Sequence, residues 1–118
     1  MSKKRIFISD NSRDFVSLLV DFFSKQLRIE IVGVAYDGKQ TLEAIAKAKP
    51  DVLLLDLVMP EMDGIEILKK IYENGDKIKV YIISALEDES IHERIKEYGV
   101  ERYFIKPVNF NEILHAIL

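Results

Sequence analysis

Residues 52–56 read VLLLD, four consecutive apolar residues followed by an aspartate. Such a run is typical of a central strand in a parallel sheet, because helices cover that strand on both faces. Pro50 ends the helix that precedes the run, and the segment MPEMDG follows it as a turn. The stretch therefore predicts a buried strand in the middle of a sheet, with Asp56 directly at its carboxyl end.

Strand-like and helix-like patterns alternate in both directions from this stretch. Residues 5–9 and 29–35 precede it as β-rich runs, and residues 80–83 and 103–105 follow it. Between these runs, apolar residues recur with the three- and four-residue spacing of amphipathic helices. The predicted inward faces include Phe15, Leu18, Leu19, Phe22 and Phe23; Ile65, Leu68, Ile71 and Tyr72; Ile91, Ile95 and Tyr98; and Phe110, Ile113, Leu114 and Ile117.

Five strand–helix units imply an α/β fold with a doubly wound parallel sheet, because right-handed crossovers place helices on both faces. Asp37 and Asp63 are suited to cap the second and third helices, and either Asn11 or Ser12 could cap the first. The fourth helix, from about residue 87, has the narrowest apolar face. We expect it to be the most loosely packed of the five.

The composition fits one compact domain that covers residues 1–118. With 17 Lys and Arg against 20 Asp and Glu, the formal charge is −3, and we expect no direct binding of nucleic acid. The lack of cysteine excludes disulfides, thiol nucleophiles and zinc–thiolate sites. No stretch approaches the roughly 20 apolar residues of a membrane span, so we expect a cytoplasmic domain with no membrane contact.

Polar residues follow four of the predicted strands at the edge where open α/β sheets bind ligands. Taken alone, most of them are compatible with ordinary loop or surface roles. Asp56 is harder to explain in that way, because a carboxylate directly after a buried strand is costly unless it is paired, coordinated or used. The set consists of Asp10, Asn11, Asp56, Ser84 and Lys106.

These residue types share one consistent chemistry. Adjacent carboxylates suit Mg²⁺, which binds through one or two carboxylates, waters and phosphate oxygens. An exposed aspartate is a competent nucleophile toward a phosphoryl group, and Mg²⁺ with a lysine can neutralise the charge of the transfer. The set predicts an aspartyl phosphate at Asp56, with the Ser84 hydroxyl donating to the phosphoryl oxygens.

Three segments resemble those of the receiver domains of two-component response regulators. LLLDLVMPEMDG (53–64) is similar to the phosphoacceptor motif, IISA (82–85) to the strand with the switch hydroxyl, and YFIKP (103–107) to the conserved-lysine loop. The resemblance covers the whole chain and implies a flavodoxin-like sheet of strand order 2-1-3-4-5. Among receivers, DNSRDFVSLL, IVGVAYDGKQ and PDVLLLD look nearest to that of the master sporulation regulator of endospore-forming bacteria.

The resemblance implies a phosphoacceptor and a metal site. Asp56 matches the phosphoacceptor, and Asp10 and Asn11 match the acidic pair that binds Mg²⁺. The backbone carbonyl of Val58 is the expected fourth protein ligand, beside these two side chains and Asp56. Val58 and Leu86 also match the two positions that tune loss of the phosphoryl group. Both are apolar and cannot orient an attacking water, so we expect a long-lived phosphoaspartate.

The resemblance also implies how the site is completed and read out. Lys106 would hold the phosphoryl oxygens, and its peptide bond to Pro107 would be cis. Ser84 and Tyr103 match the switch pair, in which the hydroxyl moves toward the phosphoryl group and the aromatic ring turns inward. The weakly packed fourth helix beside them is the expected bistable element.

Asn11 departs from the family, which has a second aspartate at this position. The alternative is to align Ser9 and Asp10 with the acidic pair. In the family, the first core residue of the helix lies four residues after the second acid. That residue is the apolar Phe15 if Asn11 is the second member, but the charged Asp14 if Asp10 is. Asparagine keeps an oxygen ligand but removes a unit charge, worth up to ~4 kcal/mol at ~4 Å and an effective dielectric of ~20. We expect Mg²⁺ affinity roughly 10- to 100-fold weaker than with aspartate.

The resemblance implies a phospho-accepting signalling switch that is not an enzyme, beyond catalysing its own aspartyl phosphorylation and dephosphorylation. A histidine kinase or phosphotransfer protein would be its partner, and the fourth helix, fifth strand and fifth helix its output surface. The chain would be a stand-alone receiver or one excised from a transcription regulator, with phosphorylation promoting a homodimer. The alternatives are a pseudo-receiver that signals without phosphate, supported by Asn11 alone, and a phosphohydrolase. For the latter, His92 and His115 are expected too far from Asp56 to act as general acid or base.

Overall fold

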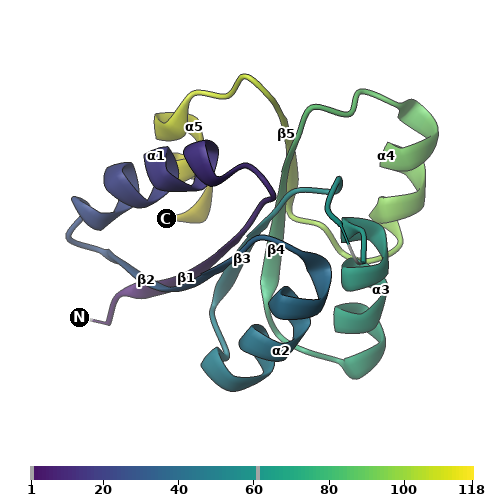
Figure 1. The fold of residues 1–118 in the computed structure, drawn as a ribbon, viewed down its shortest axis with the longest axis horizontal. Coiled ribbons are helices and arrows are strands. Elements are labelled where there is room, and N and C mark those ends of the chain that lie inside the picture. The colour runs from purple at the N-terminus through teal and green to yellow at the C-terminus, as the bar shows by residue number, and fades with distance from the viewer. Residues whose placement is uncertain (1, 61) are drawn as a thin grey trace.

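The computed structural model describes residues 2–60 and 62–118. Its strands form one parallel sheet in the order β2-β1-β3-β4-β5, with helices on both faces (Figure 1). The doubly wound, flavodoxin-like architecture and the strand order are thus confirmed. The elements are β1 Lys4–Ser9, α1 Arg13–Ser24, β2 Ile29–Ala35, α2 Gly38–Ala48, β3 Val52–Leu55, α3 Gly64–Asn74, β4 Lys79–Ser84, α4 Glu89–Lys96, β5 Arg102–Ile105 and α5 Phe110–Ile117.

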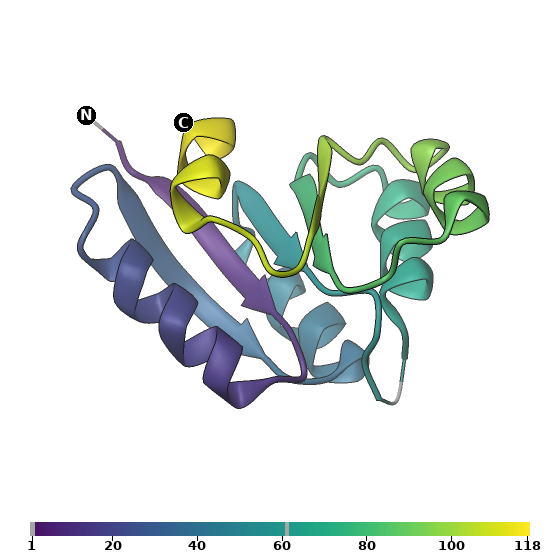
Figure 2. The ribbon, with the colours of Figure 1, turned by 90° about the horizontal axis from the view of Figure 1, so that it is seen from above.

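β3 lies at the centre of the sheet, between β1 and β4. All four of its residues are buried, as its uninterrupted apolar run predicts. Leu55 at its end is level with Ser9 of β1 and Ile82 of β4. Because the strands are parallel, they end toward the same edge of the sheet (Figure 2). The residues that follow them are therefore brought together there.

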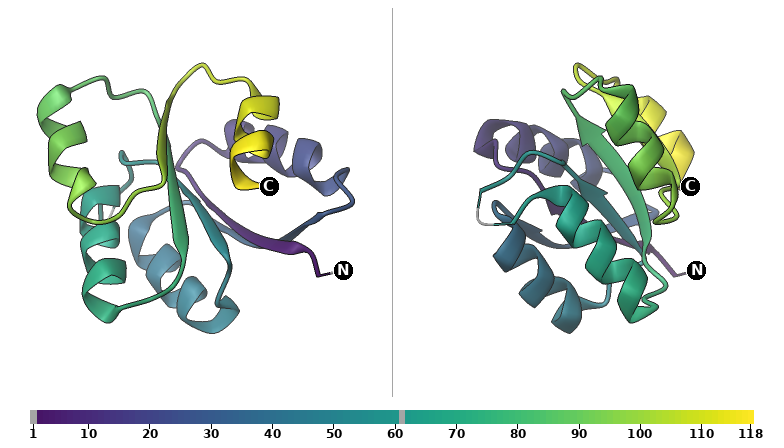
Figure 3. Two further views of the ribbon diagram at one scale, coloured as in Figure 1. Left: turned by 180° about the vertical axis from the view of Figure 1, so that it is seen from behind. Right: turned by 90° about the vertical axis from the view of Figure 1, so that its right-hand side faces the viewer.

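The two faces of the sheet pack against different helices. α1 and α5 cover one face, with Leu19, Phe23 and Ile113 in its core. α2, α3 and α4 cover the other, with Ile67 and Ile95 in its core. The two groups of helices lie on opposite sides of the sheet in the view from behind (Figure 3, left). No described helix is long and apolar enough to cross a membrane.

Polar side chains cap the helices at their first turns. Ser12 caps α1 by accepting a hydrogen bond from the amide of Phe15 at 3.2 Å. Asn11 precedes this cap, so Ser12 rather than Asn11 is the residue that caps the first helix. Asp37 and Asp63 cap α2 and α3, as predicted. The start of α1, and with it the direction in which Asp10 enters the site, is set by these short-range bonds.

Some predicted details of the elements are wrong. Leu18 and Tyr72 were expected to face inward, but they are 60% and 58% exposed because each lies at the margin of its helix's apolar stripe. α4 begins at Glu89, two residues later than predicted, after the cap residue Asp88. β1, β4 and β5 extend beyond their predicted ranges, since pairing continues past the apolar runs. Among the described helices, α4 buries the fewest residues, only Ile95, which agrees with its predicted loose packing.

Candidate functional site

The candidate site lies at the carboxyl edge of the sheet, where Asp10 follows β1, Asp56 follows β3 and Lys106 follows β5. The two aspartates are 2% and 5% exposed. The amide of Asp10 donates to the carbonyl of Ala35 at 3.1 Å, and the amide of Asp56 donates to that of Ser9 at 2.9 Å. The sheet's hydrogen bonds thus continue one residue past the strands and hold both carboxylates at neighbouring strand ends.

The two carboxylates are bound in the same way. One oxygen of each, Oδ1, accepts from the backbone amide two residues later, Ser12 to Asp10 at 2.8 Å and Val58 to Asp56 at 3.1 Å. The other oxygen, Oδ2, faces the Lys106 ammonium, at 2.8 Å for Asp10 and 3.5 Å for Asp56. One ammonium therefore bridges two carboxylates, so two negative charges and one positive charge leave the group with one net negative charge.

Burial dominates the electrostatics of Asp10. It raises the pKa of this carboxyl above its ordinary value, and the negative charge of Asp56 acts in the same direction. The hydrogen bonds from Lys106 and from the Ser12 amide lower the pKa but do not cancel the effect of burial. Ionised Asp10 is consequently held at a cost, which additional positive charge in the site would relieve.

Asn11 directly follows Asp10 in the chain and Val58 lies two residues after Asp56, and both are exposed. Ser9, the alternative member of the metal-binding pair, is buried. Its hydroxyl shares a hydrogen bond of 2.5 Å with the Thr41 hydroxyl of α2. The Ser9 hydroxyl is thus bound to α2. The assignment of Asp10 and Asn11 to the acidic pair stays a prediction.

Ser84 and Tyr103 meet at the loop between β4 and α4. Ser84 is fully buried, and its Oγ accepts from the amide of Leu86 at 3.4 Å. The Tyr103 hydroxyl donates to the carbonyl of Leu86 at 2.7 Å, so the ring is turned toward this loop. Burial raises the pKa of Tyr103, and the charges of Asp56 and Asp88 raise it further.

Phe15 is a contact of Lys106 that sequence reasoning missed. The Lys106 ammonium lies 4.3 Å from the centroid of the Phe15 ring, within range of a cation–π interaction. Phe15 also packs edge-on against Phe110 of α5, with ring centroids 5.9 Å apart. An aromatic residue at the first apolar position of α1 is the available signal, but it predicts core packing equally well.

The peptide bond from Lys106 to Pro107 is cis.

The donor set fits a hard divalent ion such as Mg²⁺. Over residues 2–60 and 62–118, no group of three or more His, Cys, Asp or Glu side chains could hold a metal ion. Mg²⁺ does not require such a cage, because it usually binds through one or two carboxylates, waters and phosphate oxygens. Asp10 and Asp56, whose side chains face the Lys106 ammonium, would supply the carboxylates. The histidines lie elsewhere, His92 against Tyr103 and His115 exposed in the last turn of α5.

Comparison with known proteins shows which family the chain resembles. Residues 6–118 match the model of the response regulator receiver domain. The receiver domain of NarL from Mycobacterium tuberculosis is 30% identical with a TM-score of 0.93, over 99% of this chain and 94% of that one. A CheX–CheY complex with BeF3 and Mg²⁺ from Borrelia burgdorferi is 28% identical with a TM-score of 0.88, over 96% and 85%. The response regulator domain of CheB from Thermotoga maritima is 28% identical with a TM-score of 0.82, over 98% and 89%.

Proposed function

Because the chain belongs to the response regulator receiver domain family, we propose that it is a phospho-accepting switch of a two-component or phosphorelay pathway. Asp56 takes a phosphoryl group from a phosphohistidine of a histidine kinase or phosphotransfer protein, with Mg²⁺ as cofactor. The observation that carries the proposal is the buried pair Asp10 and Asp56 bridged by the Lys106 ammonium. A nucleophile, a cation and a second carboxylate for a metal thereby meet at the ligand-binding edge.

The contacts indicate which oxygen of Asp56 attacks. Oδ1 accepts a hydrogen bond from the amide of Val58, whereas the one contact of Oδ2 with a described residue is the 3.5 Å contact with Lys106. Oδ2 bonds to phosphorus while the bond from phosphorus to the histidine nitrogen breaks, and the nitrogen keeps the electron pair and takes a proton from solvent. Lys106 then donates to the phosphoryl oxygens, with the Ser84 hydroxyl as a second donor. Bound Mg²⁺ supplies positive charge that neutralises the transferred group.

The surface of α4, β5 and α5 is the proposed output. Ser84 and Leu86 begin the loop that leads into α4, so a shift of Ser84 toward a phosphoryl group pulls on this helix. α4 is the element best suited to move, since it buries only Ile95. Control of transcription, in a pathway of the sporulation type, and a phosphorylation-dependent homodimer belong to the same proposal. Sedimentation of the chain before and after phosphorylation tests the dimer.

Incubation with acetyl phosphate and Mg²⁺, followed by intact mass measurement, tests the phosphorylation itself. We expect a gain of one phosphoryl group that disappears in Asp56→Asn and when Mg²⁺ is chelated. No gain at any Mg²⁺ concentration would instead favour a pseudo-receiver that signals without phosphate. Repeated turnover of a phosphate ester would indicate a phosphohydrolase.

A further inference from the structure

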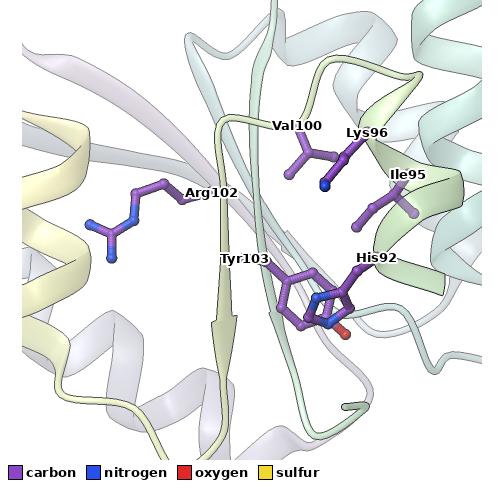
Figure 4. Close-up of a pocket in the computed structure, with 6 residues that line it drawn as sticks. All are labelled: His92, Ile95, Lys96, Val100, Arg102 and Tyr103. Atoms are coloured by element: carbon purple, nitrogen blue, oxygen red, sulfur yellow. The ribbon is translucent and has the colours of Figure 1, made fainter. Parts of the chain in front are cut away.

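His92 of α4 is stacked on Tyr103 of β5. The ring centroids are 3.8 Å apart, the ring planes are tilted by 37°, and the imidazole lies across the phenol ring (Figure 4). Within the part of the chain that the structure describes, the buried His92 Nε2 makes no hydrogen bond. A buried polar atom without a hydrogen-bond partner is unfavourable, so hydrogen bonding at Nε2 does not explain where the imidazole lies. The stacking contact with Tyr103 explains its position instead.

The same tyrosine contacts the switch loop at its other end. The Tyr103 hydroxyl donates to the Leu86 carbonyl, and the Leu86 amide donates to Ser84 Oγ. A continuous series of contacts therefore runs from His92 on α4, through the Tyr103 ring, to the hydroxyl at the end of β4.

Surrounding side chains leave the Tyr103 ring room to move. A cavity of about 190 Å³ opens beside it, between α4 and β5. Arg102 points away from the stack (Figure 4), and its guanidinium lies 4.5 Å from the centroid of the Phe104 ring. The ring therefore borders open space on the cavity side, while the imidazole covers one of its faces. The cavity is lined by His92, Ile95, Lys96, Val100, Arg102 and Tyr103.

We propose that His92 is a positioning residue, which stabilises the Tyr103 ring in its position toward Leu86 and so couples α4 to the switch loop. The ring contact needs no phosphoryl group at Asp56, so it biases the switch independently of phosphorylation. The biological meaning of this bias rests on the proposed switch function, but the bias itself is measurable in a chain that cannot be phosphorylated.

The test uses the full chain with Asp56→Asn and ¹³C-labelled tyrosine rings. NMR measures the Tyr103 ring shifts and the NOE between this ring and Leu86, and Tyr103→Phe assigns the signal among the five tyrosines. His92→Phe keeps a flat ring, His92→Leu keeps the bulk without one, and His92→Ala removes both. Tyr72→Leu serves as a control, because it breaks the neighbouring Tyr72–Tyr98 ring pair and leaves the His92 stack intact.

We expect the ratio of Tyr103 rings turned toward Leu86 to rings turned away from it to fall roughly 2- to 10-fold in His92→Leu and His92→Ala. This range corresponds to the loss of one aromatic contact. His92→Phe should restore the parent spectrum, and the control should leave it unchanged. An unchanged ring in His92→Leu, or equal loss in His92→Phe and His92→Ala, would overturn the proposal. Amide spectra establish that each variant is folded, and His92→Leu remains informative if His92→Ala is not. Absence of phosphorylation at Asp56 in the mass experiment would remove the switch function without affecting this result.

Discussion

Asn11→Asp is the substitution that most directly tests the charge of the site. Asp10 and Asp56 carry two negative charges, and the Lys106 ammonium that bridges them leaves a net charge of one negative unit. A carboxylate at position 11, which is exposed and directly follows Asp10 in the chain, would double that net charge. A divalent cation that must compete with Lys106 for these carboxylates would then bind more tightly.

The magnitude follows from Coulomb's law and screening. One additional unit charge at ~4 Å from a unit charge contributes up to ~4 kcal/mol at an effective dielectric of ~20. Because position 11 is exposed, water and salt reduce this interaction. We expect a net gain of about 1.4 to 2.7 kcal/mol, which corresponds to Mg²⁺ affinity roughly 10- to 100-fold tighter than in the parent chain.

Titration with MgCl₂, followed by calorimetry or by amide chemical shifts, measures this difference. The gain should shrink as ionic strength rises, because the added charge is exposed. Asn74→Asp at the last residue of α3 is a matched control that adds the same charge away from the strand ends of the site. Affinity in Asn11→Asp within twofold of the parent, or an equal gain in Asn74→Asp, would refute the charge account.

Three further outcomes follow from the site. Lys106→Met leaves two buried carboxylates facing each other, so without Mg²⁺ the free energy of unfolding in urea should fall by roughly 2 to 3 kcal/mol. This loss is smaller than for a fully buried pair because the Lys106 side chain is 22% exposed. Mg²⁺ should restore most of the lost stability, and an equal loss with and without metal contradicts the bridging role. Because burial raises the pKa of Asp10, the folded state binds the Asp10 proton more tightly than the unfolded chain does. Ionised Asp10 therefore lowers the stability of the fold at pH 7, and this penalty disappears as pH falls through the raised pKa toward the ordinary 3.8. Asp10→Asn should therefore raise Tm at pH 7, with a gain that shrinks toward pH 4, and a constant gain would argue against this cause. Val58→Asn should shorten the half-life of the phosphoaspartate, measured by loss of the mass gain over time, because an exposed polar side chain beside Asp56 can orient water.

The elements of the fold were predictable because their periods are local. The apolar run of β3 and the stripes of the helices indicate elements of the right type in the right order. Their ends were less predictable, as at α4, whose start depends on the Asp88 cap. Leu18 shows a different limit, because helical spacing places it near the apolar stripe but only the position of the neighbouring elements decides that it is exposed.

The site residues that directly follow a strand could be predicted from the sequence. Asp10, Asp56 and Lys106 were expected to converge, and the structure brings them into contact. Phe15 was assigned to the core alone, because its spacing in α1 explains it fully. The sequence suggests for His92 only the role of a general acid or base in a phosphohydrolase, and nothing in its sequence neighbourhood indicates its contact with Tyr103.

The parallel sheet and the polar groups at its carboxyl edge follow from the order of the residues, because strand and helix patterns are local and parallel topology brings strand ends together. Three features of the site became visible with the packing of the elements: the carboxylate oxygens that face the ammonium, the Phe15 ring beside it, and the stacking of His92 on Tyr103. These contacts join residues that are far apart along the chain. Lys106 and Asp10 are 96 positions apart in sequence, and the directions of their side chains are set by the packing of whole elements rather than by any local pattern.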